Sequence, residues 1–251
     1  MNQPSLQCFL AGAAVWLAAA VAPVLAHAEV DPAIRTYTAT YQVHYDGRQR
    51  GTSSRSVAYD DATGTYVFRS VTVLRGFLLR MAAPRPIVEH SVFRSRNGSL
   101  IPLEFSYQDG TRRGAGNVEI RFDWDAGTLS VTKRGTVAMF DAEQGTLDPG
   151  SAQVRVMVDA ARPARTTTLP LADGDGPLRY RYSRPGREIV ETIAGSQTAE
   201  VTLQQRDGSS RETLYWLAPA LDYLPVRIEQ RRDGETRLAF VLESVEWLET
   251  D

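Results

Sequence analysis

The sequence predicts a mainly β protein built of curved antiparallel sheets, a sandwich or a partial barrel, with one short helix near the middle of the chain. Three observations lead to this fold class. Apolar residues alternate with period two along much of the chain, turn sequences containing glycine recur between these stretches, and one segment shows helical spacing instead.

The first 28 residues are set apart from this fold. An apolar stretch rich in Ala and Leu runs from Phe9 to Leu25 and ends in Ala26-His27-Ala28, a small-x-small pattern of the kind that signal peptidases cleave. We therefore expect a secretory signal, cleavage after Ala28 and a periplasmic mature chain. The alternative is a retained N-terminal anchor, because about 17 apolar residues approach the minimum for spanning a bilayer.

The mature chain that follows is expected to be a single β-rich domain. Cys8, the only cysteine, lies inside the signal, so residues 29–251 contain neither a disulfide nor a cysteine ligand for a metal. The 28 Lys and Arg residues nearly balance the 30 Asp and Glu residues, which argues against nucleic acid as a partner. No membrane span is expected once the signal is removed.

The first predicted strand has one packed face. Every second residue can pack against a core, while Thr, Gln and His residues take the other side. The residues of the packed face are Tyr37, Ala39, Tyr41, Val43 and Tyr45.

A hairpin is predicted further along the chain. Val118, Ile120 and Phe122 alternate with charged or polar residues, the turn Asp125-Ala126-Gly127 follows, and a second short strand contains Leu129. Similar turns punctuate the rest of the chain and favour antiparallel pairing. They are Asp46-Gly47, Asn97-Gly98, Asp109-Gly110, Asp207-Gly208 and Asp233-Gly234.

The helix is predicted over residues 149–161. Asp148 occupies the N-cap position, Pro149 the first helical position, and Ala152 and Val156 follow at helical spacing. This helix divides the strands into two sets, at about residues 35–140 and 165–248.

The mature chain as a whole resembles a bacterial exported family known as domain of unknown function 3108. The resemblance covers nearly the whole mature chain and rests on segments that occur in order after the exported start: "YTATYQV", "NGSLIPLEFSYQD", "TLDPGSAQVRVMVDA" and "YWLAPALDYLPVRIEQRRDG". It implies a β-rich envelope protein and no assigned catalytic residue. The chain departs from the family pattern at Gly150, where a larger aliphatic residue is expected.

The sequence contains few motifs typical of catalytic or metal-binding sites, and we predict no catalytic residue, no cofactor site and no metal site. His90 shares a strand face with Val88 and Val92, which favours a half-buried histidine over a catalytic one. Ser130 and Lys133 match Ser-x-x-Lys, but they lie in a predicted strand, where residues three apart point to opposite faces.

The segment "VTVLRGFLLRMAAP", residues 71–84, is the candidate binding feature. It is too short to span a membrane, and Pro84 and Pro86 favour a sheet edge or a loop. We expect a flap in which Phe77, Leu78 and Met81 lie at the mouth of an apolar groove, and we include His90 in this candidate region.

The sequence thus favours an exported, non-enzymatic envelope protein that binds or carries a lipid or another apolar ligand, or assists envelope assembly. Two alternatives stay open. One is an interaction module whose exposed strand edges pair with an envelope protein, and the other, the least favoured, is a hydrolase-like enzyme that uses His90. An unfilled apolar cavity on the concave face of the sheet would favour the carrier, and a fully packed concave face would argue against it.

Overall fold

The computed structural model describes residues 31 and 33–248. The expected signal, its cleavage after Ala28 and the alternative anchor lie outside the described residues. Within the part described, no helix combines the length and apolar character needed to cross a membrane.

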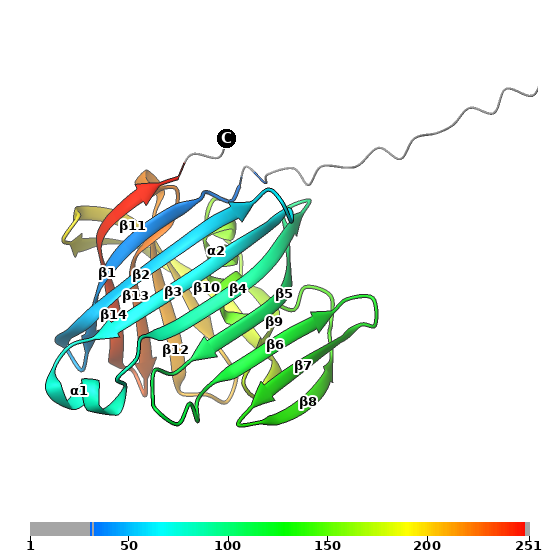
Figure 1. Ribbon diagram of the computed structural model, residues 1–251. Helices are drawn as coiled ribbons and strands as arrows, with labels where there is room; N and C mark the ends of the chain where they lie inside the picture. Colours follow the sequence, from blue (N-terminus) through cyan, green and yellow to red (C-terminus); the bar gives the residue numbers. More distant parts are fainter. Residues whose placement is uncertain (1–30, 32, 249–251) are drawn as a thin grey trace, which may run out of the picture.

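The described residues form an antiparallel sheet of 14 strands that curls around a helix (Figure 1). The strands before this helix are β1 (Tyr37–Tyr45), β2 (Arg48–Asp60), β3 (Thr65–Leu74), β4 (Ile87–Arg96), β5 (Ser99–Gln108), β6 (Val118–Asp123), β7 (Thr128–Lys133) and β8 (Thr136–Asp141). The strands after it are β9 (Thr167–Asp173), β10 (Gly176–Thr192), β11 (Gly195–Gln205), β12 (Arg211–Ala218), β13 (Leu224–Arg232) and β14 (Glu235–Trp247).

The sheet is built outward from the two ends of the described chain. β1 pairs with both β2 and β14, so the first and last strands lie side by side at the middle of the sheet. From there β2 to β8 run in chain order to one edge, and β13 to β9 run to the other. The predicted fold class, mainly β with one mid-chain helix inside curved antiparallel strands, is confirmed.

The alternation seen in the sequence explains which side chains fill the concave side. Tyr37, Ala39, Tyr41 and Val43 of β1 are each at most 2% exposed and belong to the main hydrophobic cluster. Burial of this kind stabilises a sheet by roughly 25 cal/mol for each Å² of apolar surface removed from water. Helix α2 (Pro149–Ala160) contributes Val154, Val156 and other residues to the same cluster.

Helix α2 begins as the sequence predicts. Asp148 is its N-cap, its carboxylate accepts hydrogen bonds from the backbone N–H groups of Gly150 and Ser151 at 2.7 and 3.0 Å, and Pro149 occupies the first helical position. The helix connects β8 to β9 and contacts β3, β4 and β5 on one side and β9 and β11 on the other.

Gly150 has a steric role that its sequence position does not reveal. A Cβ atom built on Gly150 would lie 2.5 Å from Cβ of Ser91 and 2.8 Å from Cδ1 of Phe68, both on buried positions of the sheet. The first turn of α2 therefore approaches β3 and β4 too closely to leave room for a side chain at this position.

The segment expected to be a loop or a sheet edge contains a short helix instead. Phe77–Ala82 forms α1, which buries none of its residues. Gly76, with φ of 99°, provides the change of direction after β3. Six residues of helical structure between a glycine and two prolines give too little periodicity for a sequence pattern to detect. A single 3₁₀ turn, η1 (Pro219–Leu221), precedes β13.

Candidate functional site

A cavity of about 520 Å³ lies on the concave side of the sheet, beside the N-terminal half of α2. Strands from both halves of the sheet line it, because β1 to β5 supply one wall and β9 and β12 to β14 supply the other. A second hollow of about 420 Å³ shares Glu89, Gln153, Asp173, Arg211 and Tyr215 with it, so the two are continuous. This volume lies within the range of roughly 300–1,000 Å³ that small-molecule sites occupy.

The lining of this cavity is amphiphilic. Its apolar part consists of Val43, Leu74, Ile87, Ile228, Leu238 and Phe240. Its charged part consists of Arg55, Glu89, Asp173 and Arg211. The concave face is thus open, as the carrier hypothesis requires, but it is more polar than the apolar groove that the sequence suggested.

Arg55 is the unusual residue of this lining. It is only 6% exposed, and its guanidinium lies 4.1 Å from the centre of the Phe240 ring, close enough for a cation–π contact. Its Nη1 donates a hydrogen bond to Oε1 of Gln153, which projects from α2. Its Nε is buried and has no hydrogen-bond partner among the described residues.

The acidic residues of the cavity do not pair with Arg55. Across the described residues, no carboxylate lies within 4.0 Å of the Arg55 guanidinium. Asp173 instead accepts hydrogen bonds from the Tyr180 hydroxyl at 3.3 Å and from the backbone of Asp175 at 2.8 Å. Glu89 lies on β4, two strands away from Arg55.

A hydrogen-bonded chain of side chains closes the wall behind the cavity. The Tyr215 hydroxyl donates to Oε1 of Gln204 at 3.0 Å, and Nε2 of Gln204 donates to the Tyr182 hydroxyl at 3.1 Å. Burial raises the pKa of Tyr215 well above its ordinary value, although the positive charge of Arg55 opposes this. Tyr215 is therefore a neutral hydrogen-bonding wall residue and not a proton carrier near neutral pH.

Strand register gives the cavity a deep end and a shallow end. Arg55 pairs with Ser70, and two residues further along β3 Thr72 pairs with Ile87. Arg55, Ser70 and Thr72 are buried, whereas Leu74, the last residue of β3, is half-buried. On β4, Ile87 and Glu89, which pairs with Ser70, are also half-buried. Arg55 thus lies deep, and the apolar residues near α1 lie at the opening.

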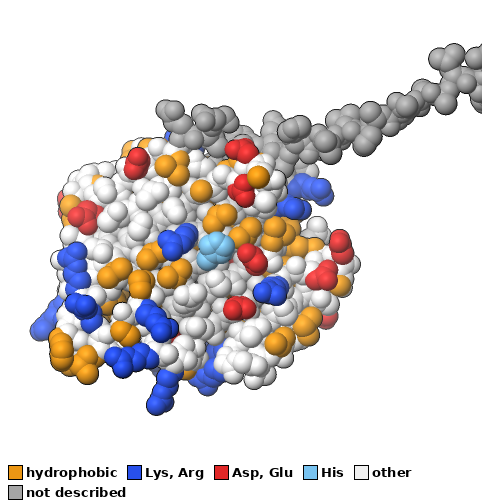
Figure 2. All heavy atoms as spheres, in the orientation of Figure 1, with side chains coloured by type: hydrophobic (Ala, Val, Ile, Leu, Met, Phe, Trp, Pro, Cys, Tyr) orange, Lys and Arg blue, Asp and Glu red, His pale blue; other side chains and the backbone are white. Residues whose placement is uncertain are grey.

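The predicted flap residues lie on the surface next to this opening. Phe77, Leu78 and Met81 are 78%, 79% and 62% exposed, and Figure 2 shows hydrophobic side chains gathered at α1 with Lys and Arg side chains around them. These three residues do not line the cavity themselves, but the strand ends that flank α1 do, through Leu74 and Ile87.

His90 lies apart from this cavity. It neighbours Glu89 on β4 and therefore points to the opposite, convex face, where it lines a shallow depression with Glu104 and Glu119. Within the described part of the chain, its imidazole has no hydrogen-bond or ion-pair partner of the kind that orients a general base. The structure does not bring His90 together with Phe77, Leu78 and Met81.

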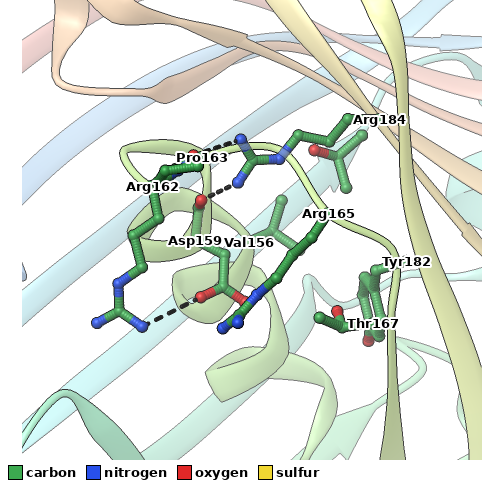
Figure 3. A pocket seen from close by; sticks show the side chains of 9 residues that line it. Val156, Asp159, Arg162, Pro163, Arg165, Thr167, Tyr182 and Arg184 are labelled. Carbon is green, nitrogen blue, oxygen red and sulfur yellow. Dashed lines mark hydrogen bonds and ion pairs between the residues drawn. The ribbon is translucent and has the colours of Figure 1, made fainter.

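A small hollow at the other end of α2 has a structural explanation (Figure 3). Arg184 donates hydrogen bonds to the carbonyl oxygens of Asp159, Ala160 and Arg162, and so satisfies the last carbonyl groups of α2 with a positive charge. The hollow measures about 30 Å³, which is the space of about one water molecule. We therefore assign the candidate site to the large cavity.

Sequence reasoning missed Arg55, the most distinctive residue of the site. It occurs in the polar stretch Ser53-Ser54-Arg55-Ser56, which reads as a solvent-facing segment. One signal was available in the sequence. Arg55 lies two residues before Val57, so both side chains point to the same face of β2, and Val57 is fully buried.

Comparisons with known proteins agree with this fold. No curated protein sequence matches the chain. A beta-barrel-like protein of domain of unknown function DUF1849 from Brucella abortus is similar in structure, with a TM-score of 0.52 and 11% identity over 86% of this chain and 99% of that one. MucB has a TM-score of 0.36 and 12% identity, over 84% of this chain and 53% of that one, and adds nothing to the assignment.

The sequence model of one family, described as "Protein of unknown function (DUF3108)", matches residues 40–239. This match extends from β1 to β14 and includes α2 and the whole lining of the cavity except Phe240. The chain therefore belongs to the DUF3108 family.

Proposed function

We propose that this protein is an exported binding protein that holds a single-chain amphiphile, such as a lipid fragment, in the cavity between β1–β5 and β12–β14. The observation that carries the proposal is a cavity of about 520 Å³ whose walls are partly apolar and partly charged. The signal-like sequence of residues 1–28 supports export to the cell envelope.

The chemistry of the walls determines the class of ligand. Ile228, Leu238 and Phe240 offer apolar surface on one wall, and burial of an alkyl chain there is worth about 0.8 kcal/mol for each CH₂ group. Polar groups such as Thr213 of β12 and Gln230 of β13 also line the cavity and offer hydrogen bonds to polar atoms of a ligand. A purely hydrocarbon ligand would leave these polar groups without partners.

Filling the cavity should weaken binding. In Thr72→Trp the larger side chain would occupy the space beside Ser70 and Ile87, since Thr72 is 8% exposed and lines the cavity. We expect the affinity for both decanoic acid and 1-decanol, measured by isothermal titration calorimetry, to fall about tenfold or more, the effect of losing about 1.4 kcal/mol of binding energy.

The control is Val73→Trp, the same substitution one residue away on β3. Val73 points to the opposite face of the strand and is 48% exposed, so its replacement should leave the affinity unchanged. Equal effects of the two variants, or absence of binding by the wild-type protein to either compound, would contradict the proposal. Circular dichroism checks that both variants fold.

We further propose that α1 covers the outer end of the bound chain. Replacing Phe77, Leu78 and Met81 together by Ser should lower the affinity for decanoic acid roughly three- to tenfold, because the alkyl chain loses apolar contacts at the opening. The melting temperature should change by less than roughly 3 °C, since all three side chains are exposed.

The matched control for α1 is Val137→Ser with Met139→Ser. These two residues of β8 are 61% and 63% exposed and do not line the cavity. If the α1 variant unfolds at a much lower temperature, its three residues belong to the core, and if its affinity equals that of the control, α1 takes no part in binding.

The interaction-module alternative has one supporting observation. β8 and β9 are the two edges of the sheet, and β8 presents the exposed Val137 and Met139. An unpaired edge with apolar side chains can accept a strand from another protein. The same β8 variant tests it, because loss of a complex in cell extract together with intact decanoic acid binding would assign the edge to a partner.

A further inference from the structure

We infer that Arg55 binds the anionic head group of the ligand, so that the cavity selects single-chain acids, either carboxylates or phosphates, over neutral amphiphiles. This inference rests on the proposed function, and it adds the chemical class of the ligand and the direction in which it enters.

The first step is the cost of Arg55 in the protein without ligand. A guanidinium stays charged at all physiological pH values, and burial of a charge without an opposite charge is strongly unfavourable. Arg55 is 6% exposed, and no carboxylate of the described residues lies within 4.0 Å of it. An acidic ligand would supply the missing charge.

The second step is that Arg55 is held in position. Gln153 accepts from its Nη1 on one side, and the Phe240 ring lies against the guanidinium at 4.1 Å, with the Tyr41 ring at 5.6 Å. Nε is buried and has no hydrogen-bond partner among the described residues, so these contacts do not satisfy all the donors of the guanidinium. A positioned guanidinium with unsatisfied donors is suited to a carboxylate or a phosphate oxygen.

Glu229 offers an internal comparison. This glutamate is 3% exposed, and it forms ion pairs with both Arg227 at 2.5 Å and Arg231 at 2.6 Å. The fold therefore satisfies a buried charge of β13 with two partners. Arg55, a buried charge that lines the cavity, has no such pairing within the described residues.

The third step gives the orientation of the ligand. Arg55 and Ser70 lie at the buried end of the cavity, whereas Leu74 and Ile87 lie at the half-buried end that continues into α1. A ligand whose head group contacts Arg55 would therefore direct its chain outward along apolar residues toward α1. The head group enters first and the end of the alkyl chain remains nearest to the surface.

The experiment compares decanoic acid, decyl phosphate and 1-decanol by isothermal titration calorimetry with the wild-type protein, Arg55→Met and Arg55→Lys. We expect at least one of the two acids to bind wild type about tenfold or more tightly than the alcohol. Arg55→Met should lower the affinity for that acid to the level of the alcohol, and Arg55→Lys should retain part of the preference because it retains the charge.

The control variant is Arg211→Met, the same substitution at an exposed arginine of the same cavity. It should keep the preference for acids. The ligand-free Arg55→Met protein should melt at the same or a higher temperature than wild type, because the unpaired buried charge is removed. A structural role for Arg55 predicts a lower melting temperature instead.

Two results would overturn the inference, and they are distinct from failure of the proposed function. Equal affinity of wild type for the acids and the alcohol, blocked by Thr72→Trp, would leave the cavity as a binding site but remove Arg55 as its anion-binding group. Unchanged acid preference in folded Arg55→Met would do the same. Absence of binding of all three compounds would remove both proposals.

Discussion

Gly150→Val should destabilise the protein by about 3 kcal/mol, an overpacking effect at the upper end of those usually measured. The reason is the close approach of α2 to the sheet, since a Cβ atom at Gly150 would lie 2.5 Å from the Ser91 side chain and 2.8 Å from the Phe68 ring. Chemical denaturation measures the loss, which corresponds to a fall of roughly 6–12 °C in melting temperature for a chain of this size.

A double-mutant cycle identifies the clash as the cause. Gly150→Ala alone should be destabilising, and Ser91→Gly in the same chain should recover part of that loss, because it removes the atom nearest to the new methyl group. Additive effects of the two substitutions, or a Gly150→Val protein as stable as wild type, would show that α2 does not approach β3 and β4 this closely.

Asp148→Ala should destabilise the protein by about 2–4 kcal/mol. Asp148 is fully buried and accepts hydrogen bonds from two backbone N–H groups of α2 and from the hydroxyls of Ser91 and Ser151, each at 2.9 Å. Alanine would leave the two buried N–H groups without partners and remove the N-cap. Asp148→Asn retains an acceptor and should lose much less stability by the same denaturation measurement.

The charge of Asp148 should also appear in the pH dependence of stability. Burial raises the pKa of Asp148 to about 6, from the ordinary value of 3.8. Between these values the folded state holds a proton that the unfolded state releases, so the contribution of this group to stability falls as pH rises from about 4 through 6. Wild type should therefore gain roughly 1.4 kcal/mol from Asp148 on going from pH 7.5 to pH 5.

The Asp148→Asn protein is the reference for this measurement, because it cannot titrate at this position. The gain on acidification should be present in wild type and missing in the variant, when the free energy of unfolding is measured in urea at both pH values. The same pH trend in both proteins would show that Asp148 is charged at pH 5 in the folded state.

The fold follows from the sequence where the pattern is local. Alternation predicts the buried face of β1, and the Asp148-Pro149 pair predicts the start of α2, because strand faces and helix caps depend on residues only a few positions apart. The single sheet, with β1 beside β14, depends on pairs such as Tyr37 with Trp247, and no short sequence pattern encodes that pairing.

The site is less predictable because it depends on distant contacts. Arg55 of β2 meets Phe240 of β14 and Gln153 of α2, and an isolated reading of β2 treats it as a surface arginine. Phe77, Leu78 and Met81 stand out in the sequence as a short apolar stretch between Gly76 and Pro84. Their position beside the cavity opening depends on how β3 and β4 end, which the fold alone supplies.

The central claim is that an amphiphile lies in the cavity between the two halves of the sheet. Nuclear Overhauser contacts between the methylene protons of decanoic acid and the protein test it most directly. We predict contacts with the ring protons of Phe240 and Tyr215 and with the methyl group of Thr72, which all line the cavity. Contacts confined to the exposed residues of α1, with none to these three residues, would contradict the account.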